Sequence, residues 1–249
     1  MKILGIRIDH VDMSTAVKRA TDGINPENPF VIVTPNSEIV VRANEEPRLK
    51  DFIENASMVV PDGIGLVIGS KLVKQPLKER VTGIDLMLKL VEYAAKNDKS
   101  IYLIGGKDPV AKQAAEALQR KYPSLKVAGT HHGYFKGLHT GNKGHADELA
   151  VIEDIKAKKP DMLFVAFGAP KQEYFIDEYK GILGAGLLMG VGGSLDVISG
   201  NVQRAPEIYQ KMGMEWAYRL AKEPWRIKRA GALPVFALNV LIKKDKPMK

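Results

Sequence analysis

The sequence contains no cysteine, which excludes disulfide bonds and zinc sites built on cysteine. It also lacks any run of about 18 consecutive apolar residues, the length that a membrane-spanning helix requires. No secretory signal is visible at the N-terminus, where Arg7 and Asp9 interrupt a short apolar stretch. From these absences we expect a cytoplasmic protein.

Several signatures of nucleotide-using and metal-dependent enzymes are also missing. There is no G-x-x-x-x-G-K-[ST] string, which excludes a P-loop. The string GVGGSLD at 190–196 has Leu195 where the third glycine of a dinucleotide fingerprint belongs. A nicotinamide-dependent oxidoreductase is therefore a weak alternative. Because no Asp-x-Asp or H-E-x-x-H string occurs, we expect neither a metal nor a cofactor.

The positive charge is concentrated near the C-terminus. The 249 residues carry a net charge of +8, and residues 201–249 hold eleven Lys and Arg against four Asp and Glu. Such a localised basic segment indicates an anionic partner, which means phosphate, lipid head groups or nucleic acid. Trp216, Tyr218 and Trp225 lie among these basic residues, so a nucleic-acid-binding protein is the non-enzyme alternative.

Apolar runs and helical patterns alternate up to about residue 200. Several of the runs are apolar throughout, which is typical of strands buried on both faces. The expected strands are Lys2–Ile8, Phe30–Thr34, Met58–Val60, Ile101–Ile104, Lys126–Thr130, Met162–Ala166 and Leu187–Val191. The expected helices are Met13–Ala20, Ser37–Ala43, Ile84–Ala95, Val110–Lys121, Ala146–Ala157 and Gln172–Glu178. This alternation predicts an α/β fold with a Rossmann-like, mostly parallel sheet flanked by helices.

The pattern changes after residue 200, which divides the chain into an α/β catalytic core at 1–200 and a basic, amphipathic helical appendage at 201–249. Pro206–Lys222 is predicted to be one helix. Leu233–Ile242 is apolar except for Asn239 and ends in lysines, as in helices that lie in a membrane interface. A terminal helix docked on the core and a dimer contact are the alternatives for this stretch.

Polar and glycine-rich strings follow most of the expected strands, and we refer to them as the strand-end loops. They are TPNSE at 34–38, PDGIG at 61–65, GGKDP at 105–109, HHGYF at 131–135, GAPKQE at 168–173 and GVGGSLD at 190–196. Ligands of open α/β sheets bind beyond the carboxyl ends of the strands. The loops therefore predict one binding face, although ordinary turns use the same residue types.

The strand-end loops offer a general base and polar contacts for a sugar. Asp62 follows a buried strand and is the best base, with an N-cap for the helix after Gly63 as the alternative. Thr34 and Asn36 offer a hydroxyl and an amide, with helix capping as their alternative. The GAPKQE loop contributes Gly168 and a second amide, Gln172.

Two further groups of residues suit an anionic ligand. The glycines at 190, 192 and 193 allow backbone N–H groups to approach a phosphate, and Asp196 can accept hydrogen bonds from a ribose or a base. A tight turn capped by Ser194 is the alternative. In the appendage, arginines can bind phosphate oxygens without a metal, or simply lie on the surface. These arginines are Arg219, Arg226 and Arg229.

Taken in order, the strings TPNSE, PDGIGLV, RVTGIDL, LIGG, HHGYF, FVAFGAPKQE, GVGGSLDVISG, RAP and EWAYRLxxEPWRIKR closely resemble the WecG/TagA/CpsF family of bacterial glycosyltransferases. The similarity extends from about residue 2 to residue 243, and the combination of motifs is specific to that family. The resemblance is strongest to its TagA branch.

The resemblance implies an inverting, metal-independent transferase with a Rossmann-like core and a mobile C-terminal appendage. The implied reaction moves N-acetylmannosamine from UDP-N-acetylmannosamine to N-acetylglucosaminyl-diphospho-undecaprenol, which forms the linkage disaccharide of wall teichoic acid. Another donor, such as UDP-N-acetylmannosaminuronate for a different polysaccharide, is the alternative. The enzyme is then expected at the inner face of the cell membrane as a peripheral protein. A homo-oligomer is compatible with this expectation, and no nucleic-acid partner is expected.

The family's motifs also imply residue roles. The proposed base of the family falls on Asp62, and its sugar-contacting residues fall on Thr34, Asn36 and Gln172. The appendage arginines implicated in activity correspond to Arg219, Arg226 and Arg229.

Overall fold

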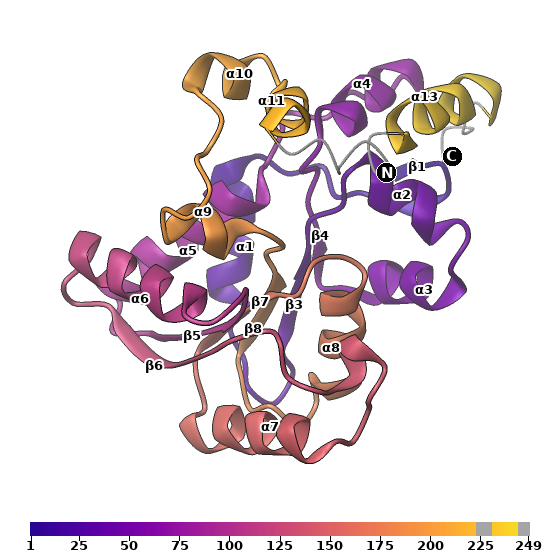
Figure 1. Ribbon diagram of the computed structural model, residues 1–249. Coiled ribbons are helices and arrows are strands. Elements are labelled where there is room, and N and C mark those ends of the chain that lie inside the picture. The colour runs from indigo at the N-terminus through magenta and orange to yellow at the C-terminus, as the bar shows by residue number, and fades with distance from the viewer. Residues whose placement is uncertain (223–230, 244–249) are drawn as a thin grey trace.

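The computed structural model describes residues 1–222 and 231–243. Six strands form one sheet in the order β4-β3-β8-β7-β5-β6, and every neighbouring pair is parallel. The strands are β3 (Phe30–Val33), β4 (Met58–Val59), β5 (Ser100–Gly105), β6 (Lys126–His131), β7 (Met162–Ala166) and β8 (Leu187–Gly190). The predicted α/β fold with a parallel sheet is confirmed (Figure 1).

Helices cover both faces of the sheet, which explains why the central strands are apolar throughout. All five residues of β7 and all four of β8 are buried. One hydrophobic cluster includes buried residues of α1 (Met13–Asp22), α5 (Gly83–Lys96), α6 (Val110–Lys121) and α9 (Ser194–Ile198). The other includes residues of α2 (Ser37–Ala43), α3 (Pro47–Asn55), α7 (Ala146–Lys158) and α8 (Lys171–Tyr179). A short 3₁₀-helix, η1 (Leu138–Thr140), precedes α7.

The N-terminal segment does not join the sheet, so the prediction of one strand over Lys2–Ile8 is wrong. It forms a two-stranded antiparallel hairpin of β1 (Lys2–Ile3) and β2 (Ile6–Arg7). The two residues between these strands, Leu4 and Gly5, have φ values of 51° and 75°. Positive φ at both central positions is the mark of a type I′ turn, which reverses the chain tightly.

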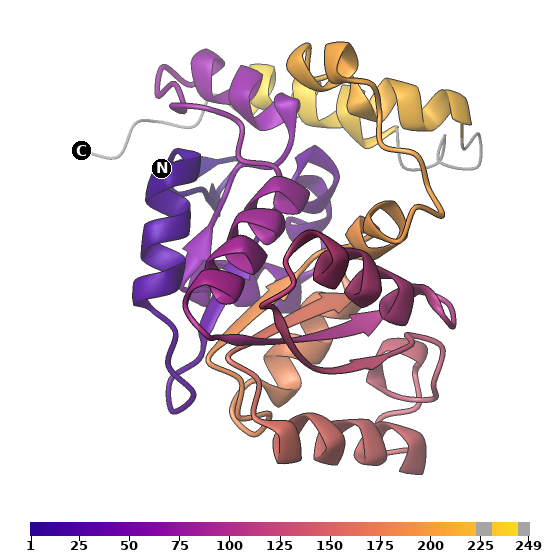
Figure 2. The same cartoon turned by 90° about the vertical axis from the view of Figure 1, so that its left-hand side faces the viewer.

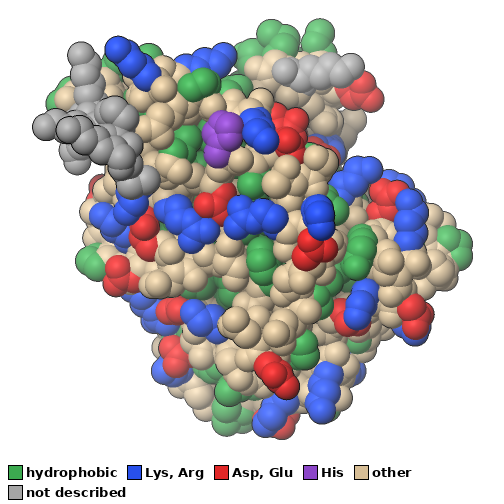
Figure 3. Space-filling model, turned by 180° about the vertical axis from the view of Figure 1, so that it is seen from behind, with side chains coloured by type: hydrophobic (Ala, Val, Ile, Leu, Met, Phe, Trp, Pro, Cys, Tyr) green, Lys and Arg blue, Asp and Glu red, His purple; other side chains and the backbone are tan. Residues whose placement is uncertain are grey.

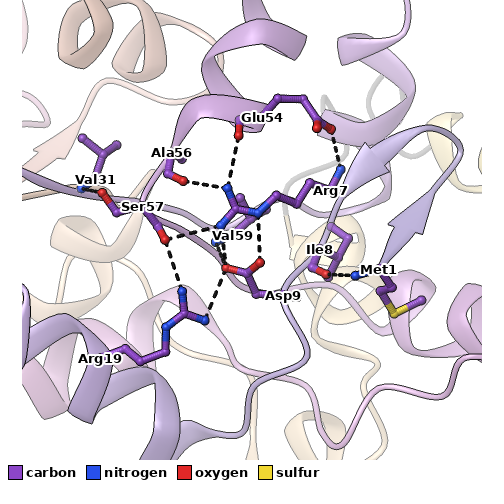
Figure 4. Close-up of polar contacts among 10 residues, drawn as sticks. All are labelled: Met1, Arg7, Ile8, Asp9, Arg19, Val31, Glu54, Ala56, Ser57 and Val59. Carbon is purple, nitrogen blue, oxygen red and sulfur yellow. Dashed lines mark hydrogen bonds and ion pairs between the residues drawn. The ribbon is translucent and has the colours of Figure 1, made fainter. Parts of the chain in front are cut away.

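A partly buried ionic network fixes this hairpin to the edge of the sheet (Figure 4). The Arg7 guanidinium donates to both carboxylate oxygens of Asp9, at 3.0 and 2.9 Å, and to the carbonyl oxygen of Ala56 at 2.8 Å. Asp9 in turn accepts a hydrogen bond from the backbone N–H of Val59 at 3.1 Å. The network thus holds β4, the strand that leads into the loop containing Asp62.

Four helices lie over the carboxyl end of the sheet (Figures 1 and 2). They are α4 (Ile64–Leu72), α10 (Glu207–Lys211), α11 (Glu215–Lys222) and α13 (Ala232–Lys243). The single helix predicted over Pro206–Lys222 is in fact two, because Gly213 between them has a φ of 69°. Helix α3 was not predicted, and α4 was expected only as the helix after Gly63 in the capping alternative for Asp62.

Helix α13 is apolar on two sides. Phe236 and Val240 are only 3% and 2% exposed and belong to the core, where Phe236 lies next to Gly69 of α4. On its outer side, α13 presents four side chains that are 46–69% exposed, and Ile68 and Leu72 of the adjacent α4 add to this surface. We call it the outer apolar surface: Ile68, Leu72, Val235, Leu238, Leu241 and Ile242. A docked terminal helix, one of the alternatives, is therefore present.

Within the ranges 1–222 and 231–243, no helix is both long enough and apolar enough to cross a membrane. On the face drawn in Figure 3, Lys and Arg side chains are interspersed with Asp and Glu. Such mixing matches the near-neutral charge balance of residues 1–200, which hold 26 basic and 25 acidic side chains. The core therefore does not present a continuous basic surface on this face.

Candidate active site

A pocket of about 340 Å³ opens at the carboxyl ends of β3, β4, β7 and β8. Four of the six strand-end loops line it, whereas the loops after β5 and β6 do not. The neighbouring strands β3 and β8 lead into α2 and α9, which pack on opposite faces of the sheet. A crevice is expected where adjacent connections diverge in this way.

Asp62 lies in the pocket wall and is held there by the loop before α5. Its Oδ1 accepts a hydrogen bond from the backbone N–H of Gly83, the first residue of α5, at 2.9 Å. Its own N–H donates to the carbonyl oxygen of Pro35 at 3.2 Å. The alternative that Asp62 caps the helix after Gly63 is wrong, because Gly63 itself is the N-cap of α4. Asp62 instead joins three chain segments at the pocket.

Thr34 and Asn36 line the same wall. The Oδ1 of Asn36 accepts from the backbone N–H of Ile39 at 3.0 Å, so Asn36 is the N-cap of α2, as the alternative held. The amide NH₂ group of Asn36 is then the part of this side chain that suits a ligand. Thr34 lies beside the start of α5, where an added Cβ on Gly83 would be 3.2 Å from the Thr34 hydroxyl.

Gln172 is almost fully buried at the base of the pocket and holds the loop after β8. Its Oε1 accepts from the backbone N–H of Gly192 at 3.0 Å, and its Nε2 donates to Glu173 at 2.9 Å. Gly192 has a φ of +53°, and a Cβ on Gly190 would lie 2.5 Å from the Gln172 Nε2. Gly192 is therefore favoured by its backbone conformation and Gly190 by the close approach of the Gln172 side chain, which explains this part of the GVGG string.

The structure brings together most, but not all, of the predicted site residues. Gly168, Gln172, Gly192 and Gly193 line the pocket with Thr34, Asn36 and Asp62. Gly190 lies behind Gln172, and Asp196 lies on α9 outside the pocket lining. Gly193, rather than Ser194, is the N-cap of α9, and the Ser194 hydroxyl donates to the carbonyl oxygen of Val191.

The predicted appendage arginines fall where the structure is not described in full. Arg219 belongs to α11, but its side chain is outside the described part. Arg226 and Arg229 lie in the stretch 223–230, which is outside it altogether. Their roles stay predictions.

Sequence reasoning missed two other arginines, Arg80 and Arg204, which line the pocket together with Glu215. Arg80 lies in RVTGIDL and Arg204 in RAP, two strings to which no chemistry was assigned, and Glu215 begins EWAYRL, in which only Arg219 was given a role. Arg80 comes two residues before Thr82, the N-cap of α5, but it follows the helix α4 and not a strand, so a search of the strand ends could not find it.

Arg204 is fixed by an acidic partner on the core. Its Nη2 donates to Asp85 of α5 at 2.7 Å, and Thr82 donates to the same oxygen. Burial opposes the charge of Arg204, but the hydrogen bond to Asp85 and the carboxylates of Asp85 and Glu215 raise its pKa. Burial likewise opposes the charge of Asp85, yet the hydrogen bonds from Arg204 and Thr82 lower its pKa. Both groups are therefore charged at neutral pH.

Glu173 is a buried acid directly behind the pocket. Its side chain is enclosed by the core, its Oε2 has no hydrogen-bond partner, and burial raises its pKa to about 7. The carboxyl is thus protonated in the folded chain at pH values where it would be ionised in the unfolded chain. Through Gln172, this acid is linked to the glycine loop at 190–193.

We expect Glu173 to make stability depend on pH. Because its pKa is raised in the folded state, its contribution is complete below pH 4.5 and is lost as pH rises through about 7. The free energy of unfolding should therefore fall by roughly 2–3 kcal/mol between pH 5 and pH 8 through this group. In Glu173→Gln, urea unfolding at the two pH values should lack this difference, whereas Glu178→Gln on the same helix should retain it. An equal pH dependence in wild type and Glu173→Gln would contradict the assignment.

The described residues contain no group of three His, Asp or Glu side chains placed to hold a metal ion. The pocket is lined by two carboxylates on strand-end loops, Asp62 and Glu38, by a glycine loop fixed by Gln172, and by two arginines near the C-terminal helices. A fold of this type with such a pocket defines an α/β protein suited to a polar, anionic small molecule.

Comparison with known proteins places the chain within this class. The sequence profile of the glycosyl transferase WecG/TagA/CpsF family matches residues 1–249, and the chain therefore belongs to that family. The family resemblance predicted from the motifs is confirmed. An enzyme that transfers a glycosyl group is accordingly favoured over the oxidoreductase and nucleic-acid-binding alternatives.

Three similar proteins carry the same name, N-acetylglucosaminyldiphosphoundecaprenol N-acetyl-beta-D-mannosaminyltransferase. The protein from Staphylococcus aureus (strain MW2) is 36% identical over 249 residues, which cover 99% of this chain and 94% of the relative. The protein from Bacillus subtilis (strain 168) is 38% identical and covers 88% and 81%. The protein from Bacillus spizizenii is 38% identical and covers 84% and 78%.

Proposed function

We propose that this chain transfers N-acetylmannosamine from UDP-N-acetylmannosamine to N-acetylglucosaminyl-diphospho-undecaprenol, releasing UDP. The names of the relatives at 36–38% identity support both the sugar and the lipid acceptor. The structural observation that supports the proposal is the position of Asp62 in the pocket wall, which Thr34 and Asn36 also line. Formation of the linkage disaccharide of wall teichoic acid is the pathway step that this reaction would serve.

In the proposed mechanism, Asp62 accepts the proton of the acceptor hydroxyl as the hydroxyl oxygen attacks the anomeric carbon of the donor. The new C–O bond forms opposite the bond to UDP, which breaks with its electron pair staying on the diphosphate. This single displacement inverts the configuration at the anomeric carbon. The hydrogen bond from Gly83 holds the carboxylate in place while the proton moves.

The leaving diphosphate requires positive charge, and this chain offers it without a metal. The N–H groups of the glycine loop at 192–193 and the guanidinium groups near the C-terminal helices are suited to that task. Gln172 lines the pocket, but both atoms of its amide already have partners. We therefore propose that it positions the glycine loop, and that Thr34 and Asn36 make the sugar contacts.

The C-terminal helices give this mechanism a location. The outer apolar surface on α4 and α13 is suited to the interface of the inner leaflet, where the lipid acceptor lies. Helices α11 and α13 also contribute Trp216, Leu220 and Leu233 to the pocket lining. Docking at the membrane would then also exclude water from the donor.

The proposal is tested by transfer to a synthetic prenyl-diphosphate-N-acetylglucosamine with a panel of UDP sugars. We expect a product with the mass of one added N-acetylhexosamine from UDP-N-acetylmannosamine, a β linkage by NMR, and full activity in EDTA. Preferential use of UDP-N-acetylmannosaminuronate would instead identify the alternative donor. A strict requirement for Mg²⁺ or Mn²⁺ would contradict the metal-independent mechanism.

A further inference from the structure

Arg80, Arg204 and Glu215 meet where the C-terminal helices cover the pocket. The Arg80 Nη2 is hydrogen-bonded to Glu215 Oε2, and the Arg204 Nε lies 3.7 Å from Glu215 Oε1. The three side chains are only 15%, 26% and 22% exposed. One carboxylate thus sits between two guanidinium groups in a partly desolvated wall of the pocket.

The side chain of Arg204 and the backbone next to Arg80 are held in place independently of Glu215. Arg204 is bonded to Asp85 of α5, and the segment after Arg80 is fixed by the hydrogen bond from Val81 N–H to the carbonyl oxygen of Pro61. Glu215, by contrast, is the first residue of α11 and comes from beyond Gly213, whose left-handed φ separates α10 from α11. The cations therefore belong to the sheet end, and the anion is supplied by a separate helix.

A carboxylate does not satisfy this pair of arginines completely. The Arg204 Nε is buried without a hydrogen-bond acceptor, since its contact with Glu215 is an ion pair too long for a hydrogen bond. Leaving a buried donor unpaired costs free energy, and more so on a charged group. A diphosphate has more acceptor oxygens than a carboxylate, and guanidinium groups bind phosphate oxygens in bidentate, charge-assisted pairs.

We propose that Arg80 and Arg204 form a diphosphate-binding site, that Glu215 occupies it in the free protein, and that the diphosphate of a substrate takes its place. This inference depends on the proposed function in one respect, because it requires that a substrate contain a diphosphate. Glu215 and a diphosphate bound to the same two arginines would repel each other, so the carboxylate leaves as the diphosphate enters. Occupation of the site is thereby coupled to the position of α11, the helix that carries Arg219.

The test is UDP binding by calorimetry to the full chain and to Glu215→Gln. Because the variant lacks the internal competitor, it should bind UDP roughly three- to tenfold more tightly than wild type. Glu207→Gln, the same change on the exposed surface of α10, is the matched control and should bind as wild type does. Glu215→Ala removes the carboxylate without adding an amide and is the second variant, with the same expected gain.

The gain should also depend on Arg204. In an Arg204→Gln background, UDP should bind more weakly than to wild type, and the added Glu215→Gln change should give a smaller gain. If Glu215 were instead a permanent link that holds α11 in place, both Glu215 variants would bind UDP equally or more weakly than wild type. That result would overturn the proposal.

A second arm of the experiment identifies the source of the diphosphate. The same proteins are titrated with a short prenyl-diphosphate-N-acetylglucosamine, and a gain confined to UDP or to this acceptor assigns the site to the donor or to the acceptor. A gain with neither overturns the inference even if sugar transfer proceeds normally. A gain with UDP in a protein that transfers another sugar would leave the inference standing while the proposed donor fails.

Discussion

Asp62→Asn is expected to slow sugar transfer by about a thousandfold, the order that loss of a positioned general base produces. The amide cannot accept the proton of the acceptor hydroxyl at neutral pH, so the displacement loses its base. Asn retains an Oδ1 that can accept the hydrogen bond from Gly83, and the start of α5 should stay in place. Binding of UDP should therefore change by no more than about twofold.

The measurement is single-turnover transfer together with UDP affinity on the same preparation. Asp12→Asn provides a matched control, because Asp12 is also a carboxylate at the start of a helix, where it accepts from the backbone N–H of Thr15 at 2.8 Å. Asp12 lies outside the pocket lining, and its variant should transfer sugar at the wild-type rate. Transfer by Asp62→Asn within tenfold of wild type would remove Asp62 as the base.

The second large effect is expected at the outer apolar surface. Leu238 and Leu241 of α13 are 58% and 57% exposed, and replacing both by Gln should weaken binding to anionic liposomes by at least about tenfold, because each loses the burial of a leucine side chain in the interface. The inward residues Phe236 and Val240 are untouched, so the helix should stay docked on α2 and α4. The thermal unfolding midpoint should accordingly change little.

The same variant separates membrane contact from chemistry. Transfer to an acceptor embedded in vesicles should fall with liposome binding, whereas transfer to a short, water-soluble acceptor should persist. The control is Leu149→Gln with Ile182→Gln, two side chains that are each 52% exposed. Leu149 belongs to α7, which lies at the opposite end of the molecule from α13 (Figure 1). Liposome binding equal to that of wild type would show that α13 is not the membrane contact.

The arrangement of the C-terminal helices changes how the basic segment is understood. Its charge excess predicts an anionic partner, and the described part now shows that one of its acids, Glu215, is shared between two arginines. One of those arginines, Arg80, belongs to the core. The other, Arg204, belongs to the basic segment and forms an ion pair with Asp85 of the core. Charge in this region is therefore balanced between the segment and the sheet, and net charge along the sequence could not show that balance.

The sequence by itself determined the α/β fold and most of the strand-end loops. Short, continuous apolar runs such as Met162–Ala166 favour a strand covered on both faces, and they were located to within one or two residues. It also determined the family, because motif order needs no coordinates. The predicted bounds were wrong where a single turn interrupts an element. Leu4–Gly5 splits the first strand, and Gly213 splits the helix predicted at 206–222.

Only the tertiary structure decided which loops meet. The sequence pattern did not distinguish which of the six strand-end loops line the pocket. The strand order β4-β3-β8-β7-β5-β6 places the loops after β5 and β6 away from it. It also decided that Arg80, Arg204 and Glu215 share one wall, although up to 135 residues separate them. Contacts of that kind depend on strand order and helix docking, which are set by the summed burial of the whole core, and no local pattern encodes them.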